Sequence, residues 1–158
     1  MSIAAVRDYL TPFGLADKIL EFSTSSATVE LAAQAVGCEP ARIAKTLSFR
    51  VQGEPVLIVA AGDARIDNPK FKALFHEKAR MIPAAEVENA VGHAPGGVCP
   101  FALLPGVRVY LDISLRRFSA VYPAAGDAHS AVRLTPDELA ELSHSLAWVD
   151  CCKDWAQG

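Results

Sequence analysis

Two β-rich runs that lie close together decide the fold: Ala44-Lys45-Thr46-Leu47-Ser48-Phe49-Arg50-Val51 and Pro55-Val56-Leu57-Ile58-Val59-Ala60-Ala61. Both are rich in the β-branched, aromatic and aliphatic residues that fit a half-buried strand. The three residues between them, Gln52-Gly53-Glu54, are typical of a tight turn. The sequence therefore predicts a β-hairpin over residues 44–61.

Helix signals lie on both sides of this hairpin. Apolar residues recur at helical intervals over residues 3–13, and Pro40 suits a first helical position. Thr28 and Thr135 are polar caps before further helical patterns, and Asn68-Pro69 is typical of a helix start. The expected longer helices cover residues 3–13, 28–36, 68–75, 83–91 and 135–144.

Shorter apolar runs predict further strands at residues 18–22, 81–82, 107–113, 119–122, 131–134 and 147–149. Residues 153–158 are expected to form a loose tail. Helices and strands are interspersed without strict βαβ alternation, which indicates an α+β fold with a mixed or largely antiparallel sheet. A chain of 158 residues is expected to be one domain, residues 1–158.

Composition excludes several classes of protein. The chain has no apolar run of 18 residues, so no membrane span is expected, and its N-terminus does not have the pattern of a secretory signal. Its formal net charge of −3 argues against a general nucleic-acid binder. The four cysteines lack C-x-x-C spacing, which favours reduced thiols in a cytoplasmic protein.

The charge is unevenly distributed. Residues 40–80 carry a net charge of +4, which leaves −7 for the remainder. Such a basic flank could bind a few phosphates without making the whole protein basic. The alternative is an ordinary solvated surface, and the sequence alone leaves both possibilities open.

Glycine and proline are concentrated in one other stretch, Gly92-His93-Ala94-Pro95-Gly96-Gly97-Val98-Cys99-Pro100-Phe101. Proline fixes φ and glycine permits positive φ and close approach, so a loop of defined shape with outward-facing amides is expected. The alternative is a tight connection between two elements. Lys45 is the second unusual feature, because a lysine among apolar residues at the start of a strand is not a typical solvated charge.

These segments carry a family resemblance. Ile43-Ala44-Lys45-Thr46-Leu47, Ala61-Gly62-Asp63, the Gly96-x-x-x-Pro100 loop and Val109-Tyr110-Leu111-Asp112 occur in an order similar to that of the YbaK/proline-tRNA-synthetase-associated editing domain family. The resemblance covers about residues 25–149. It implies a curved, partly closed mixed sheet with helices outside it.

The resemblance also implies an activity. The family removes wrong amino acids from mischarged tRNA, commonly tRNA for proline, by hydrolysing the ester. The resemblance makes Lys45 functionally required and makes the loop from Gly96 to Pro100, with Gly97, the cradle for the carbonyl end of the substrate. A cation and loop amides are donors suited to stabilising an oxyanion. The expected chemistry needs no metal and no organic cofactor.

The substrate-binding residues are less clearly marked. His93, Val98, Phe101 and Ala102 are candidates for a pocket wall, and Thr46 adjoins Lys45. Asp112 and Ser114 could shape the site or cap a turn. Two departures from the family pattern concern amino-acid specificity. His93 stands where tyrosine is common, and Asp127 and His129 stand where cysteine-specific members usually carry other residues.

Other interpretations of the polar residues stay open. Cys99 could be a nucleophile with His93 or His129 as its base, although a small buried thiol is the simpler interpretation. His93 and Cys99 have no two further metal ligands nearby in sequence, so no metal site is predicted. Lys45 could also be buried and bonded to backbone.

We therefore expect a free-standing, cytoplasmic aminoacyl-tRNA deacylase. Its substrate would be tRNA for proline carrying a small amino acid such as alanine or cysteine. Its partners would be the acceptor end of aminoacyl-tRNA and an aminoacyl-tRNA synthetase. No association with a membrane is expected. The alternative is a non-catalytic module that binds a tRNA end or a nucleotide.

Overall fold

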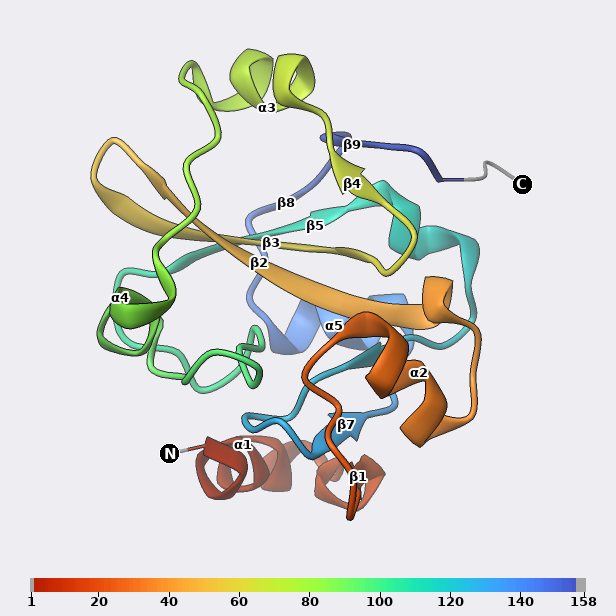
Figure 1. The fold of residues 1–158 in the computed structure, drawn as a ribbon. Coiled ribbons are helices and arrows are strands. Elements are labelled where there is room, and N and C mark those ends of the chain that lie inside the picture. Colours follow the sequence, from red (N-terminus) through yellow and green to blue (C-terminus); the bar gives the residue numbers. More distant parts are fainter. Residues whose placement is uncertain (1, 156–158) are drawn as a thin grey trace.

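The computed structural model describes residues 2–155 (Figure 1). The predicted hairpin is confirmed: β2 (Ile43–Val51) and β3 (Glu54–Ala61) pair antiparallel, with Lys45 opposite Ala60. Gln52 and Gly53 form the turn, and both have positive φ, 53° and 79°. Two consecutive positive φ values are the requirement of the tight hairpin turn whose twist matches the flanking strands.

The hairpin lies within a curved five-stranded sheet of order β6-β2-β3-β5-β8. The three added strands are β5 (Arg108–Asp112), β6 (Tyr122–Pro123) and β8 (Ala147–Val149). Each of them pairs in parallel with its neighbour, and only β2 and β3 are antiparallel. The predicted mixed sheet is confirmed, whereas a largely antiparallel one is wrong, because the chain leaves β3 and returns beside it through a long crossover.

Two small antiparallel pairs flank this sheet. One joins β1 (Ile19–Glu21) to β7 (Ser130–Val132), and the other joins β4 (Arg65–Ile66) to β9 (Cys152–Lys153). The loose tail predicted from Lys153 is therefore wrong at its start, because Lys153 pairs with Arg65 in this ladder. The rest of that prediction, at residues 156–158, falls outside the described residues.

The predicted helices are confirmed. They are α1 (Ser2–Leu10), α2 (Val29–Val36), α3 (Asn68–Phe75), α4 (Ala84–Val91) and α5 (Pro136–Leu142), with short 3₁₀ turns at Thr11–Phe13, Ala16–Lys18, Pro40–Arg42 and Ile113–Arg117. Thr28 caps α2 and Thr135 caps α5, each by accepting a hydrogen bond from a backbone N–H of the first turn. Asp67 caps α3, one residue before the expected start.

Two expected strands are shorter than predicted. Residues 81–82 form only a single bridge, between Met81 and Phe49. The run 119–122 contributes a bridge at Val121 and the first residue of β6. Both segments lie at the edge of the sheet, where few partners are available to extend a ladder.

The core follows the central strand. The side chains of β3 from Val56 to Ala61 are fully buried, and those of the flanking strands and the inner helix faces pack around them. In Figure 1, α3 lies at one end of the molecule, and α1 with the β1–β7 pair lies at the opposite end. Within residues 2–155, no helix has the length and apolar character needed to cross a membrane.

Candidate functional site

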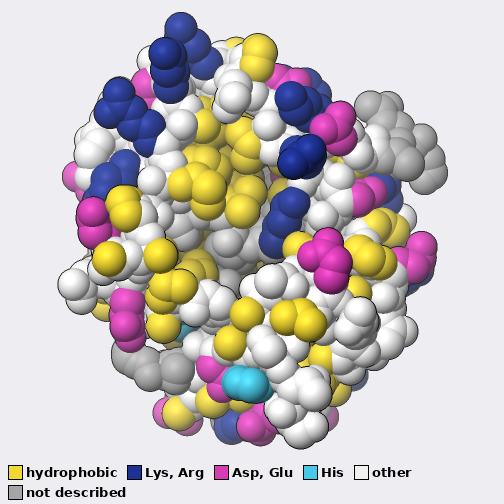
Figure 2. All heavy atoms as spheres, in the orientation of Figure 1, with side chains coloured by type: hydrophobic (Ala, Val, Ile, Leu, Met, Phe, Trp, Pro, Cys, Tyr) yellow, Lys and Arg dark blue, Asp and Glu magenta, His cyan; other side chains and the backbone are white. Residues whose placement is uncertain are grey.

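A cavity of about 510 Å³ lies between β2 and the glycine-proline loop. Figure 2 shows it as a hollow bordered by hydrophobic side chains, with Lys and Arg side chains above it and on its right. Its walls come from the start of α2, the outer edge of β2, residues 81–87, the loop at residues 95–98, and β6 with β7. The segments that form it are far apart in sequence, so the fold is needed to assemble it.

The edge of β2 is open where it faces this cavity. β6 pairs with β2 only at Ile43 and Ala44. Farther along β2, Ile82 N donates to Ser48 O at 2.9 Å, and the next bond joins Arg50 to residue 80. Between these two flanking segments β2 has no strand partner on this edge among the described residues. The main chain around Thr46 is therefore available to a ligand.

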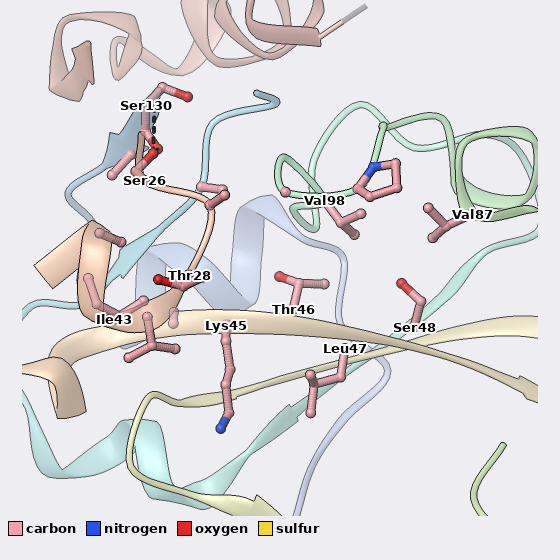
Figure 3. Close-up of a pocket in the computed structure, with 18 of the residues that line it drawn as sticks. Ser26, Thr28, Ile43, Lys45, Thr46, Leu47, Ser48, Val87, Val98 and Ser130 are labelled. Carbon is pink, nitrogen blue, oxygen red and sulfur yellow. Dashed lines mark hydrogen bonds between the residues drawn. The ribbon is translucent and has the colours of Figure 1, made fainter. Parts of the chain in front are cut away.

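Side chains of β2 alternate between two faces, so neighbouring residues have different surroundings. Thr46 and Ser48 point toward the loop that carries Val98, and Lys45 and Leu47 point to the opposite side of the strand (Figure 3). The Thr46 hydroxyl is buried and has no hydrogen-bond partner within the described part of the chain. An unpaired buried hydroxyl is costly, which makes it a candidate ligand-binding group.

Lys45 is half-buried, and its ammonium is bonded to backbone. The ammonium donates to Gly62 O at 3.4 Å and also to Ala64 O. Burial lowers the pKa of Lys45, and the nearby Cys152 and Asp63 partly oppose this effect. Because an ammonium has three protons, one donor is left after these two carbonyls. The structure thus places this cation beneath β2 and not directly under the loop.

The turn that accepts Lys45 is itself held in place. Arg117 donates to both carboxylate oxygens of Asp63, at 2.9 and 2.6 Å, and this ion pair lowers the pKa of Asp63. Gly62 packs against the 3₁₀ turn before β2, where an added Cβ would lie 2.0 Å from Pro40 O. Only glycine fits there, so the carbonyls that bind Lys45 have fixed positions.

The loop has the defined shape expected from its composition. Gly97 N donates to Ala94 O at 3.1 Å and closes a turn over Pro95 and Gly96, in which Gly96 has a φ of +88°. Proline followed by a residue with positive φ is the requirement of a type II turn. Gly97 in turn lies against the backbone of Asp127, where a Cβ would be 2.5 Å from the Asp127 Cα. Gly97 therefore positions the loop.

Two residues of this loop that line the cavity have unpartnered amides. Gly96 and Val98 both line it, and neither N–H has a hydrogen-bond partner among the described residues. Preorganised backbone N–H groups of this kind are suited to holding the negative oxygen that forms when water attacks an ester carbonyl. They are the candidate oxyanion donors of the site.

His93, Cys99, Pro100 and Phe101 lie behind the loop in the core. His93 is 1% exposed, and its Nε2 lies 2.7 Å from Phe101 O and 3.6 Å from Cys99 Sγ. Desolvation lowers the pKa of His93, and it raises the pKa of Cys99 to about 12. A fully buried protonated thiol is a poor nucleophile, so these residues support the loop from behind, and Val98 is the predicted wall residue that lines the cavity.

Asp112 is fully buried at the end of β5 and caps the turn that follows. Its Oδ2 accepts from Ser114 N at 2.9 Å, and its Oδ1 accepts from Cys151 N at 3.0 Å and from Cys151 Sγ at 3.5 Å. Asp112, Cys151 and Cys152 are the one group of three potential metal ligands found in residues 2–155. Because these hydrogen bonds occupy the carboxylate, we interpret the group as structural.

His129 lies outside the cavity lining, on an exposed loop. Its ring Nδ1 lies 3.0 Å from Thr24 O, and its backbone N–H donates to Asp127 Oδ1 at 3.0 Å. The next residue, Ser130, does line the cavity and exchanges hydrogen bonds with Ser26, which the sequence analysis missed (Figure 3). No local pattern marks single serines in polar turns, so only their contact across the fold identifies them.

Comparison with known proteins agrees with this geometry. Residues 24–142 match the family model of the aminoacyl-tRNA editing domain. YwhH of Bacillus subtilis (strain 168), a protein of uncharacterised function, is 53% identical over 156 residues, which cover 98% of this chain and 99% of YwhH. A proline–tRNA ligase of Desulfovibrio desulfuricans is 32% identical over 126 residues, which cover 78% of this chain but only 21% of the ligase.

A solved structure also indicates similarity to tRNA-editing proteins. A candidate trans-editing enzyme for prolyl-tRNA synthetase superposes with a TM-score of 0.83 and 30% identity, covering 99% of this chain and 97% of that one. The family model spans well over half of the chain and includes β2, the glycine-proline loop and the cavity between them. The chain therefore belongs to the aminoacyl-tRNA editing domain family, as the resemblance in its sequence implied.

Proposed function

We propose that the protein is a trans-acting aminoacyl-tRNA deacylase that hydrolyses the ester of mischarged tRNA in the cytoplasm. Its proposed substrate is tRNA for proline that carries alanine or cysteine. The likeness to a candidate trans-editing enzyme over nearly the whole of both chains supports an enzyme that works apart from the synthetase. The likeness to part of proline–tRNA ligases supports the choice of tRNA and a functional association with that synthetase.

One observation carries the proposal: a cavity bounded by an open strand edge on one side and two unpartnered loop amides on the other. The ester carbonyl would lie against the Gly96 and Val98 amides, which would stabilise the oxyanion as water adds. Removal of one oxyanion donor typically costs about 10²–10³ in rate. An aminoacyl ester is already activated, so such donors could suffice without a nucleophilic side chain.

Lys45 would have a supporting role in this chemistry. Its ammonium is held by two backbone carbonyls, and its remaining proton would orient a phosphate at the end of the tRNA. A cation fixed in this way positions the ester without contacting its carbonyl. Positioning alone can contribute substantially, because a displacement of about 1 Å can cost roughly 10²-fold in rate.

Editing has a physical motive. A synthetase site that admits proline cannot strongly reject a smaller side chain, since one methylene is worth only about 1–3 kcal/mol of discrimination. A second pocket that excludes the larger correct residue removes the error. The proposed cavity, with Val98 and Ile43 in its wall, would act as this second sieve.

The test is hydrolysis of alanyl- and cysteinyl-tRNA for proline by the wild type and by Lys45→Ala. We expect turnover by the wild type with excess substrate and a large loss in the variant. A non-catalytic binding module would protect the ester instead of consuming it. Equal rates for both proteins would remove the proposed role of Lys45.

A further inference from the structure

Three exposed cations lie in and just after α3: Lys72, Lys78 and Arg80. None of them has an ion-pair partner within the described part of the chain. Lys70 and Arg50 lie nearby, and both are in ion pairs. Glu77 is the one acid between residues 72 and 80, and its carboxylate accepts from Gln52 N at 3.0 Å, so this segment carries a net charge of +2.

These cations lead to the mouth of the cavity. Backbone hydrogen bonds from Arg50 N to Arg80 O and from Ile82 N to Ser48 O fix residues 80–82 along β2. Met81 lies between them, lines the cavity, and is 60% exposed. In Figure 1 the chain runs from α3 past the front of β2 to α4, and Figure 2 shows Lys and Arg side chains along this side of the hollow.

We propose that Lys72, Lys78, Arg80 and Met81 form a docking strip for the acceptor end of tRNA. Its cations bind backbone phosphates, and Met81 packs against the last base as the strand enters the cavity. This inference rests on the proposed function, since it concerns the RNA that carries the ester.

Charge and chemistry favour RNA as the occupant. If the aminoacyl ester lies in the cavity, the nucleotides before it must leave through the mouth, where the strip begins. A nucleic-acid backbone is a line of phosphates, and cations that neutralise them release condensed counterions. An exposed methionine next to such cations offers a flexible, polarisable contact for a base. The whole chain has a net charge of −3, so an RNA contact is expected at a local group of cations and not over the whole surface.

The probe is an uncharged RNA hairpin with the acceptor stem and single-stranded 3′ end of tRNA for proline. Its affinity is measured by fluorescence anisotropy over a range of salt concentrations. We expect Lys72→Ala/Lys78→Ala to lower affinity by about tenfold and to make the log–log salt dependence shallower by about two, one for each phosphate contact. Met81→Ser is expected to lower affinity without changing the salt dependence.

A matched control is available at the opposite end of the molecule. Lys18 and Arg133 are also exposed and outside the ion pairs of the described residues, and Arg133 N donates to Lys18 O at 3.3 Å. Lys18→Ala/Arg133→Ala removes the same charge and should change affinity by less than about twofold. Equal losses in the two double variants, or no loss in the first, would overturn the proposed strip.

The hairpin carries no ester, so this test is independent of hydrolysis. If the wild type binds the hairpin through the strip but leaves alanyl-tRNA intact, the deacylase proposal fails and the strip stands. If the wild type hydrolyses the ester and the Lys72→Ala/Lys78→Ala protein binds and hydrolyses equally well, the strip fails and the deacylase stands.

Discussion

Gly97 lies so close to Asp127 that an added Cβ would be 2.5 Å from the Asp127 Cα. This contact joins the glycine-proline loop to the loop before β7, and both segments border the cavity. We therefore predict that Gly97→Ala forces the two loops apart, which lowers the free energy of unfolding by about 1–3 kcal/mol. Urea denaturation measures this loss, and deacylation assays should show a parallel loss of activity.

Gly106→Ala is the control for this variant. Gly106 has a positive φ of 89° but no atom within 4 Å of an added Cβ. It therefore measures backbone strain alone, which should cost about 1 kcal/mol and leave deacylation unchanged. An equal loss of activity in both variants would mean that the contact with Asp127 does not position the loop.

Thr46→Val tests the unpartnered hydroxyl. The substitution preserves shape and removes a buried polar group that has no partner among the described residues. We expect the free protein to be unchanged or more stable by up to about 1 kcal/mol. If the hydroxyl binds substrate, kcat/KM for deacylation should fall. A stable variant with full activity would show that the hydroxyl does not contact the substrate.

Lys45→Met separates charge from packing. Methionine keeps the apolar stem but leaves the Gly62 and Ala64 carbonyls without their donor. We predict a loss of about 1 kcal/mol in the free energy of unfolding and a fall of roughly 10²-fold in kcat/KM. Lys45→Arg keeps the charge and should recover part of both, as measured by denaturation and single-turnover hydrolysis. No recovery by arginine would mean that the ammonium geometry itself is required.

The Asp63–Arg117 ion pair predicts a loss of stability in acid. The hydrogen bonds from Arg117 lower the folded-state pKa of Asp63 below its ordinary value of 3.8. Between these two pKa values the unfolded chain binds more protons than the folded one, so folding stability rises with pH there. The contribution is complete above the unfolded pKa and is lost as pH falls through the folded pKa.

Asp63→Asn should remove this contribution. We expect the variant to be less stable than the wild type at pH 7, with a difference that narrows as pH falls below 3.8, as measured by urea midpoints. A difference that stays constant down to pH 2 would show that the ion pair does not control this pH dependence.

Cys99 is predicted to be inert in the native protein. Burial raises the pKa of Cys99 to about 12, so its thiol is protonated at pH 8. A thiol reagent should modify the half-buried Cys38 first, and Cys99 only after unfolding. Cys99→Ala should keep deacylation within about twofold, because no covalent step passes through the sulfur. Loss of hydrolysis in a folded Cys99→Ala protein would restore the nucleophile hypothesis.

Local features of the fold were predictable, and non-local ones were not. The hairpin turn at Gln52-Gly53 and the caps at Thr28 and Thr135 depend on adjacent residues, and the sequence contains their signals. The parallel pairing of β3 with β5 joins segments about 50 residues apart, which no local pattern specifies. The two-residue strand β9 was missed for the same reason.

At the site, the alternation of side chains between the two faces of β2 predicts which residues face the loop, and the composition of β2 does not. Residues alternate between faces of a strand, so Lys45 and Thr46 cannot both point at the loop. The structure assigns the loop side to Thr46. His93 was expected at a pocket wall, whereas the structure buries it, with its Nε2 2.7 Å from Phe101 O.

The opening in the edge of β2 has a consequence for solubility. Unpaired strand edges invite pairing with a second chain, which leads to aggregation. Here β6 and residues 80–82 close both sides of the gap, so an incoming strand would find only the main chain around Thr46 to pair with. At this edge the main chain around Thr46 can thus bind a small ligand without offering a long template for strand addition.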